Sequence, residues 1–152
     1  AHEHGDARRA LELLRVAAEI AERKVLNKVE IKHIDEAEEK IERDRVIDIV
    51  NTQPKQVQAV LYSVLLLYFK EQGVIFTGEI YEIYKNVSIQ SGLRPLTQRR
   101  ISDVLAELDM LGIINAKVIS KGRYGRTREI TLAIPHFSVP KFSKLLKDKL
   151  GL

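Results

Sequence analysis

The sequence predicts a mostly α-helical protein with one small β-hairpin, organised as two successive units. Apolar residues recur at helical spacing through most of the 152 residues. A proline at position 54 follows a polar stretch, and a glycine-bounded, cation-rich segment separates two strand-like runs near the end of the chain. We therefore expect a helical unit at residues 1–51 and a second unit, which carries the hairpin, at residues 54–152.

The first unit is expected to contain two helices. Asp6 is predicted to cap a helix that ends near Lys24, and a second helix is predicted at about residues 32–50, after a break at Asn27-Lys28. The apolar stripe predicted for the first helix consists of Ala10, Leu11, Leu14, Ala17, Ala18 and Ala21. So few residues bury little surface by themselves, so this helical pair is expected to need further cover.

The predicted boundary is the segment Asn51-Thr52-Gln53-Pro54, because the residue before a proline is pushed out of helical conformation. The charge balance also changes there. Residues 1–53 contain 10 Lys and Arg against 13 Asp and Glu, a net charge of −3, whereas residues 54–152 contain 15 against 8, a net charge of +7. A basic half of this kind favours a polyanionic partner.

The elements predicted for the second unit follow one another at short intervals. They are a helix at about 56–70, an extended run at 74–76, a helix capped by Thr77 and ending near Gly92, a helix opened by Thr97 and ending near Leu111, strands at 113–120 and 127–134, and a final helix at about 141–150. Gly122 and Gly125 can adopt the positive φ that the end of a hairpin requires. This order predicts a winged helix, which is a helix-turn-helix with a β-hairpin added.

The helix after Thr97 has the pattern of a DNA-recognition helix. Its predicted buried stripe is Ile101, Val104, Leu105 and Leu108, and the outward or flanking residues are Thr97, Gln98, Arg99, Arg100, Ser102, Asp103 and Ala106. Arginine can pair with guanine, aspartate can accept from cytosine and alanine can contact a thymine methyl group in the major groove. The alternative is a solvated face, on which Asp103 only tethers Arg99 or Arg100.

The hairpin carries five cations and no acid over residues 117–128. Arg123, Tyr124 and Arg126 are expected at its tip, where arginine can enter a minor groove. The other cations, Lys117, Lys121 and Arg128, are expected to contact phosphates. The alternative is a plain solvated turn.

Other chemistry finds little support in the sequence. Cysteine is absent, His2, His4, His33 and His136 are scattered, and no metal site is expected. The nucleotide-binding, hydrolase and zinc-protease motifs are missing. Since the sequence has neither a signal-peptide pattern nor an apolar run of about 20 residues, we expect no membrane partner and a cytoplasmic, nucleoid-associated location.

Two stretches resemble a known family. Residues 5–11, Gly-Asp-Ala-Arg-Arg-Ala-Leu, resemble the sensor-2 motif in the lid of AAA+ ATPases. Residues 96–100, 107–114 and 122–128 resemble the winged helix of the archaeal Orc/Cdc replication initiators, and Ile41-Glu42-Arg43-Asp44-Arg45 lies between the two motifs. The resemblance runs from Gly5 to Leu132.

This resemblance implies a function. Members of the family bind double-stranded DNA at origin repeats, hold ATP and Mg in an AAA+ module, and help to load the replicative MCM helicase. Their recognition helix lies in the major groove and their wing in the minor groove, and Arg8 would be the sensor-2 arginine. Walker A, Walker B and sensor 1 are missing here, so we expect a fragment that begins within the lid, binds no cofactor by itself and is no enzyme.

Three other functions are compatible with parts of the pattern. A winged-helix transcription regulator would also bind DNA, but it has no use for a sensor-2 motif. A protein-interaction winged helix should have a short or neutral wing, unlike this one. A hydrolytic enzyme would need a nucleophile–base pair or a metal site, and neither is visible in the sequence.

Overall fold

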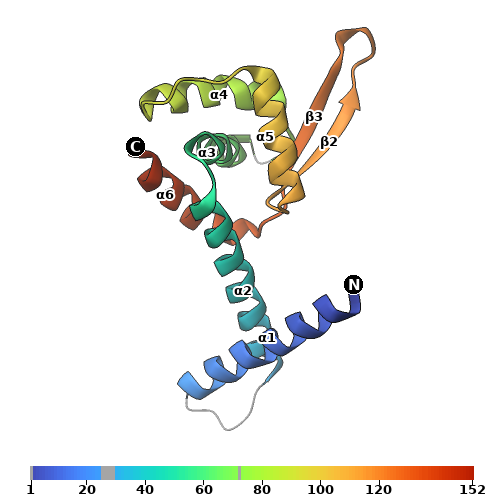
Figure 1. Ribbon diagram of the computed structural model, residues 1–152, viewed down its shortest axis with the longest axis vertical. Helices are drawn as coiled ribbons and strands as arrows, with labels where there is room; N and C mark the ends of the chain where they lie inside the picture. The colour runs from blue at the N-terminus through green and yellow to red at the C-terminus, as the bar shows by residue number, and fades with distance from the viewer. Residues whose placement is uncertain (1, 25–29, 72) are drawn as a thin grey trace. The chain divides into compact units, whose positions relative to one another are not determined.

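The computed structural model describes residues 2–24, 30–71 and 73–152, which form two compact units that divide between Asp48 and Ile49. It confirms the predicted fold class, because helices dominate and the strands form one small sheet (Figure 1). The break predicted at Asn27-Lys28 lies outside the described residues. None of the helices in the described ranges is both long and apolar enough to span a bilayer.

The first unit contains α1 (His2–Arg23) and most of α2 (Ile31–Thr52), which continues into the second unit. Its buried cluster consists of Val16, Ala17 and Ala37, with Leu13, Ile20, Ile34 and Ile41 packed around it. The predicted cap at Asp6 is wrong, because α1 begins at His2.

The apolar stripe predicted for α1 is partly wrong. Ala17 and Ala21 are buried as expected, but Leu11 and Leu14 are 68% and 54% exposed. Alanine is small and tolerated at the surface, so a stripe of alanines does not fix the rotation of a helix. The larger side chains Leu13, Val16 and Ile20 do, because burying them removes more apolar area from water.

The second unit is built around α3 (Lys55–Glu71). Residues 57–65 of this helix are all buried, because α4 (Thr77–Gln90), α5 (Gln98–Met110) and α6 (Val139–Leu150) all pack against it. In Figure 1, α3 is seen nearly end-on with these three helices around it. A helix surrounded in this way has little solvent-facing stripe, which explains its long apolar run.

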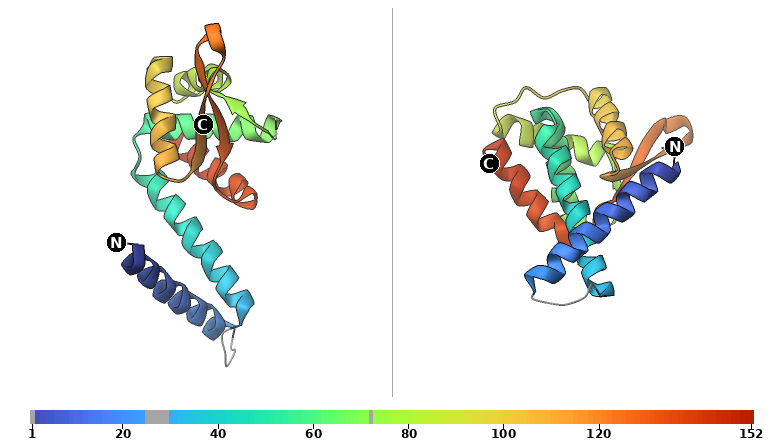
Figure 2. Two further views of the ribbon diagram at one scale, coloured as in Figure 1. Left: turned by 90° about the vertical axis from the view of Figure 1, so that its right-hand side faces the viewer. Right: turned by 60° about the horizontal axis from the view of Figure 1, so that its bottom comes forward.

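A three-stranded antiparallel sheet completes the second unit in the order β1–β3–β2. Its strands are β1 (Ile75–Phe76), β2 (Ile114–Ser120) and β3 (Arg126–Leu132), so the extended run before α4 adds a strand to the predicted hairpin (Figure 2). The wing closes through one 3₁₀ turn, η1 (Gly122–Tyr124), and a second 3₁₀ turn, η2 (His136–Ser138), precedes α6. Gly122 and Gly125 have φ of 60° and 89°, as predicted.

The starts of α4 and α5 differ. Thr97 caps α5 as expected, since its side chain accepts a hydrogen bond from the Arg100 N–H. The cap predicted at Thr77 is wrong. Strand pairing holds Phe76 extended, with φ −108° and ψ 152°, and so places the N-cap at Phe76 and makes Thr77 the first helical residue. Within the described residues, no side chain caps α4.

Leu105 tests whether α5 depends on this core. Its side chain is fully buried, so we expect Leu105→Ala to lower the free energy of unfolding by about 2–5 kcal/mol through lost burial and a residual cavity. Urea denaturation measures the change. Glu107→Ala, on the exposed side of the same helix, is the control and should stay within about 0.5 kcal/mol of wild type. Equal effects for the two variants would contradict the packing of α5.

Candidate nucleic-acid interface

Helix α5 presents a polar face to solvent because its four predicted core residues, Ile101, Val104, Leu105 and Leu108, are buried. The structure places the predicted outward residues on the opposite side. Arg99 and Asp103 are exposed, and Ser102 and Ala106 are half-buried. The flanking residues at the start of the helix, Thr97, Gln98 and Arg100, are also exposed.

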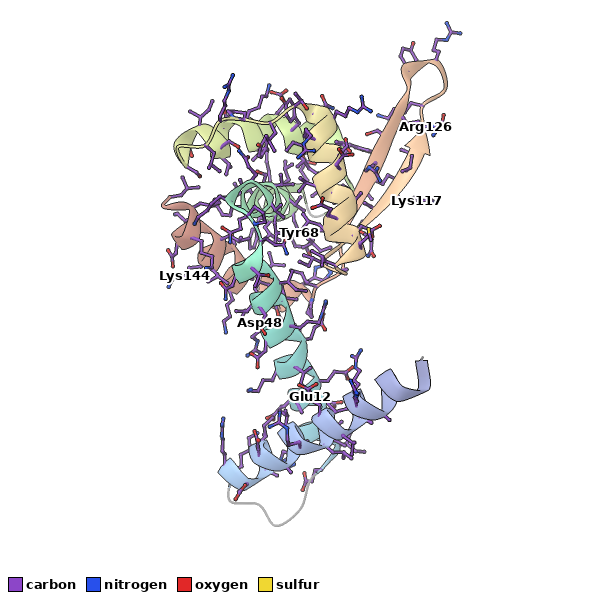
Figure 3. The ribbon with its side chains drawn as sticks, viewed as in Figure 1. Glu12, Asp48, Tyr68, Lys117, Arg126 and Lys144 are labelled. Atoms are coloured by element: carbon purple, nitrogen blue, oxygen red, sulfur yellow. The ribbon has the colours of Figure 1, made fainter. Side chains whose placement is uncertain are left out.

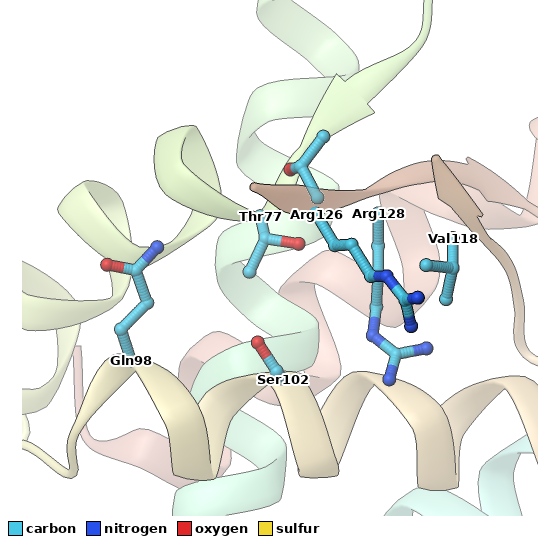
Figure 4. Close-up of a pocket in the computed structure, with 7 residues that line it drawn as sticks. Thr77, Gln98, Ser102, Val118, Arg126 and Arg128 are labelled. Atoms are coloured by element: carbon cyan, nitrogen blue, oxygen red, sulfur yellow. The ribbon is translucent and has the colours of Figure 1, made fainter. Parts of the chain in front are cut away.

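A groove of about 310 Å³ lies between α5, β3 and the start of α4, and we call it the α5–wing groove (Figure 4). Its lining residues are Thr77, Gln98, Ser102, Val118, Arg126, Thr127 and Arg128. Two predicted residues of the recognition helix, Gln98 and Ser102, thus face two predicted cations of the wing. The groove is open to solvent and polar, which suits a charged ligand better than an apolar one.

The wing has two faces with different chemistry. Residues paired directly across two strands share a face, and successive residues alternate between faces. Arg128 pairs with Val118, and both line the groove together with Arg126. Lys117 pairs with Glu129, so it lies on the opposite face and does not line the groove. Figure 3 labels Lys117 and Arg126 on the wing.

The remaining wing residues occupy the tip and its base. Arg123 and Tyr124 belong to η1, where both are exposed, and Tyr124 has 85% of its surface accessible. Lys121 lies with its Nζ 4.8 Å from the centre of the Phe76 ring, a cation–π contact that ties this cation to β1. The five cations of the wing therefore have different surroundings.

The arginines of α5 and β3 form no salt bridge among the described residues. The salt bridges among the described residues involve cations of the two helices of the first unit and the linker before α2, and one pair on α4 between Lys85 and Glu82. None of them includes a cation of α5 or β3, and Asp103 does not tether Arg99 or Arg100. The positive charge of these arginines is therefore not neutralised by an ion pair within the described parts of the chain.

An acidic pair lies near the wing. Burial raises the pKa of Glu79, and a hydrogen bond shared with Glu71 and the charge of Glu71 raise it further. Lys121 opposes this shift by favouring the ionised carboxylate. Lys121 is thus held between the Phe76 ring and an acidic neighbourhood, unlike the arginines of the groove.

Three residues that line the groove were not predicted from the sequence, namely Thr77, Val118 and Thr127. Val118 could have been found from strand alternation, since it pairs with Arg128. Thr77 could not, because only the packing of α4 beside β3 brings it to the groove. Arg8, the predicted sensor-2 residue, is exposed on α1. His33 is buried, and its Nδ1 accepts the Glu30 N–H at 2.9 Å, while no three potential metal ligands are grouped within the described ranges.

Comparison with protein families identifies both units. The family described as the CDC6 C-terminal winged helix domain matches residues 48–141, and the family described as the Cdc6 AAA+ ATPase-type lid domain matches residues 1–39. The chain belongs to the Cdc6 family. This result confirms the resemblance to archaeal Orc/Cdc initiators, and it supports the assignment of α1 and the start of α2 to an AAA+ lid.

Individual relatives agree with the family. The chain is 53% identical over 139 residues to an ORC1-type DNA replication protein of Pyrococcus horikoshii, and 54% identical over 137 residues to the ORC1-type DNA replication protein 7 of Halobacterium salinarum. These matches cover 91% and 89% of the chain. The chain spans only 33% and 26% of the length of those relatives, about a third or less.

Solved structures show the same fold. The structure of the Aeropyrum pernix ORC1 protein in complex with DNA matches with a TM-score of 0.81 and 44% identity, over 93% of this chain and 36% of that one. The structure of Drosophila ORC bound to DNA matches with a TM-score of 0.56 and 18% identity, over 91% of this chain and 35% of that one. The second likeness shows the fold alone.

Glu79→Gln tests the acidic pair. Because the pKa of Glu79 is raised in the folded protein, its ionisation at neutral pH destabilises the fold, and this loss disappears when pH falls well below the ordinary value of 4.5. We expect Glu79→Gln to be more stable than wild type at pH 7, with a smaller difference near pH 3.5. Thermal unfolding at both pH values measures this effect.

The control for that experiment is Glu82→Gln, which lies on the same helix and removes an exposed ion pair with Lys85. It should change stability little at either pH, because exposed ion pairs contribute little. A Glu79→Gln variant that is less stable than wild type at pH 7 would contradict the unfavourable interaction between Glu71 and ionised Glu79.

Proposed function

We propose that this chain binds double-stranded DNA at replication origins, as part of a replication initiator, with α5 in the major groove and the wing in the minor groove. The observation that carries the proposal is a polar groove that Arg126 and Arg128 of β3 line together with Gln98 and Ser102 of α5, while Arg99 and Arg100 of the same helix are exposed. Such a surface repels itself in the free protein and is relieved by a polyanion. The family match and the DNA complex of the Aeropyrum pernix relative support the same function.

The two elements take different tasks in this proposal. Arg99 lies in the exposed first turn of α5, where it can reach base edges and pair with guanine, and Ser102, Asp103 and Ala106 continue the same outward face. Arg123, Tyr124 and Arg126 reach from the wing into the minor groove, which attracts arginine through its negative potential. We assign the main phosphate contacts to Arg100 and Arg128. Lys117 and Lys121 take peripheral phosphate contacts, because Lys117 lies on the opposite face of the wing and Lys121 is held by the Phe76 ring.

We place the first unit within a longer protein. Its relatives are about three times as long or longer, and the matched lid family is of the AAA+ ATPase type. We place ATP and Mg in an AAA+ module of such a protein, with Arg8 reaching the nucleotide phosphates. Arg8 fits this role because it is exposed and takes no part in the salt bridges found among the described residues. The MCM helicase is the partner that the family resemblance implies.

Variants of Arg99 and Arg123 should distinguish sequence-specific recognition of bases from sequence-independent DNA affinity. We expect Arg99→Ala to reduce the preference for a selected duplex over its scrambled version by about 1–3 kcal/mol, because a bidentate guanine contact is lost. Arg123→Ala should weaken binding to both duplexes. The salt slope should fall by about 1 if Arg123 contacts phosphate, or the loss should follow groove width if it enters the minor groove.

The measurement is fluorescence anisotropy at several salt concentrations, with a duplex that the chain selects from a random pool. Arg15→Ala, which removes a cation from the first unit that is paired with Glu19 at 2.9 Å, is the control and should bind as wild type. If wild type fails to bind either duplex at low salt, the proposal is wrong and a protein-interaction role replaces it.

A second experiment concerns the nucleotide. We expect this chain to hydrolyse no ATP and to bind ATP-Mg more weakly than micromolar, because Arg8 supplies a single exposed cation and the sequence contains no phosphate-binding loop. Isothermal titration calorimetry with ATP and Mg is the measurement. Micromolar binding that Arg8→Ala abolishes would overturn this expectation.

A further inference from the structure

The first turn of α4 contains a hydroxyl group that the fold leaves unused. Thr77 is only 5% exposed, and its Oγ1 has no hydrogen-bond partner among the described residues. The residue lines the α5–wing groove, and Figure 4 shows its hydroxyl pointing into the space that Arg126 also enters. A buried hydroxyl without a partner costs free energy in the free protein, so its presence requires an explanation.

The backbone of the same turn is also free to bind an anion. The N-cap of α4 is Phe76, whose side chain cannot accept a hydrogen bond, so in the described structure the N–H groups of the first turn have no side-chain cap. A Cβ atom added at Gly78 would meet nothing within 4 Å, so no neighbouring group crowds the turn at this residue. The start of a 14-residue helix attracts anions through its dipole and its free N–H groups.

Charged and polar side chains complete the surroundings. Arg126 and Arg128 line the groove from β3, and Gln98 and Ser102 line it from α5. The acid of this turn, Glu79, does not belong to the groove lining and interacts with Glu71 and Lys121 instead. The groove therefore offers hydrogen-bond donors from three elements and no carboxylate among its lining residues.

We propose that the Thr77 hydroxyl, the N-terminus of α4 and the guanidinium group of Arg128 form a binding site for one DNA backbone phosphate. The inference rests on the proposed function, since it assumes that DNA lies along α5 and the wing. A phosphate held there fixes the position of the duplex between the recognition helix and the wing without reading its sequence. The unpaired hydroxyl of the free protein finds its partner in the complex.

Thr77→Val is the decisive variant because it removes the hydroxyl and keeps the shape of the side chain. We expect an unfolding temperature equal to or above that of wild type, since an unpaired buried hydroxyl is lost. DNA affinity should fall by about tenfold, as expected for one hydrogen bond to a charged group. The loss should be similar on every duplex, and the salt slope should not change, because no cation is removed. Arg128→Ala should lower that slope by about 1.

Two further variants serve as controls. Thr77→Ser keeps a hydroxyl and should retain most of the affinity. Ser88→Ala removes another fully buried hydroxyl that has no partner in the described structure, near the far end of the same helix, and should bind DNA as wild type does. A Ser88→Ala variant that loses as much affinity as Thr77→Val would overturn the proposal, because the effect would then not come from the groove.

Neutral methylphosphonate linkages, placed at one DNA position at a time, identify the source of the phosphate. One position should weaken wild type strongly and Thr77→Val much less. If inorganic phosphate competes with DNA and no single linkage matters, the site holds a free anion and the proposal is wrong. If wild type fails to bind DNA, the proposed function is wrong. If wild type binds DNA and Thr77→Val binds with equal affinity, only the proposed phosphate site is wrong. Parallel loss of stability and affinity in Thr77→Val would indicate a structural role and also overturn it.

Discussion

The short pairing between β1 and β3 determines most of the geometry of the α5–wing groove. Ile75 pairs with Ile130, and Phe76 with Glu129, so two residues tie the wing to the segment that begins α4. The pairing holds Phe76 extended, which fixes the first turn of α4 beside β3. It also fixes which face of β3 meets the core, because Ile75 and Ile130 are both buried. By alternation, Arg128 and Arg126 then share the face of Ile130 and reach the groove. A register shift of one residue would exchange the two faces of the wing.

Charge is distributed between the two units in different ways. The helices of the first unit carry many ion pairs on their surfaces, such as Arg15–Glu19 at 2.9 Å and Arg45–Glu42 at 2.6 Å. These pairs contribute little to the free energy of unfolding, but each of them neutralises a cation at the surface of the first unit. The second unit has few acids. Glu79 interacts with Glu71 and Lys121, Glu129 pairs across the wing with Lys117, and none of these acids lines the groove. The fold therefore keeps cations beside the α5–wing groove.

Sequence reasoning succeeded where large apolar side chains repeat at helical spacing and failed where the signal depended on tertiary contacts. The stripe of α5 could be predicted because Ile101, Val104, Leu105 and Leu108 leave one possible rotation of the helix. The buried stripe of α1 could not be predicted, because its alanines do not define a single apolar face and Leu11 and Leu14 are exposed. Thr77 looked like a helix cap because threonine is a favoured cap, yet strand pairing moved the cap to Phe76. The wing cations could be predicted as a group, but their division between two faces needed the register of β2 and β3.

The cations of the wing lie on two different faces, so their total number does not give the number that can contact DNA in the α5–wing groove. Five cations in residues 117–128 favour a polyanion, but only Arg126 and Arg128 line the groove beside α5. Lys117 lies on the other face next to Glu129, and Lys121 is held by the Phe76 ring and the acids near it. Arg123 is exposed at the tip, in η1. In the proposed complex, a duplex lying along α5 would meet Arg126, Arg128 and the uncapped start of α4 at its centre, and the tip of the wing would reach beyond them. Because only neutralised phosphates release counterions, the salt dependence of binding should reflect this smaller set of contacts and not the full charge of the wing.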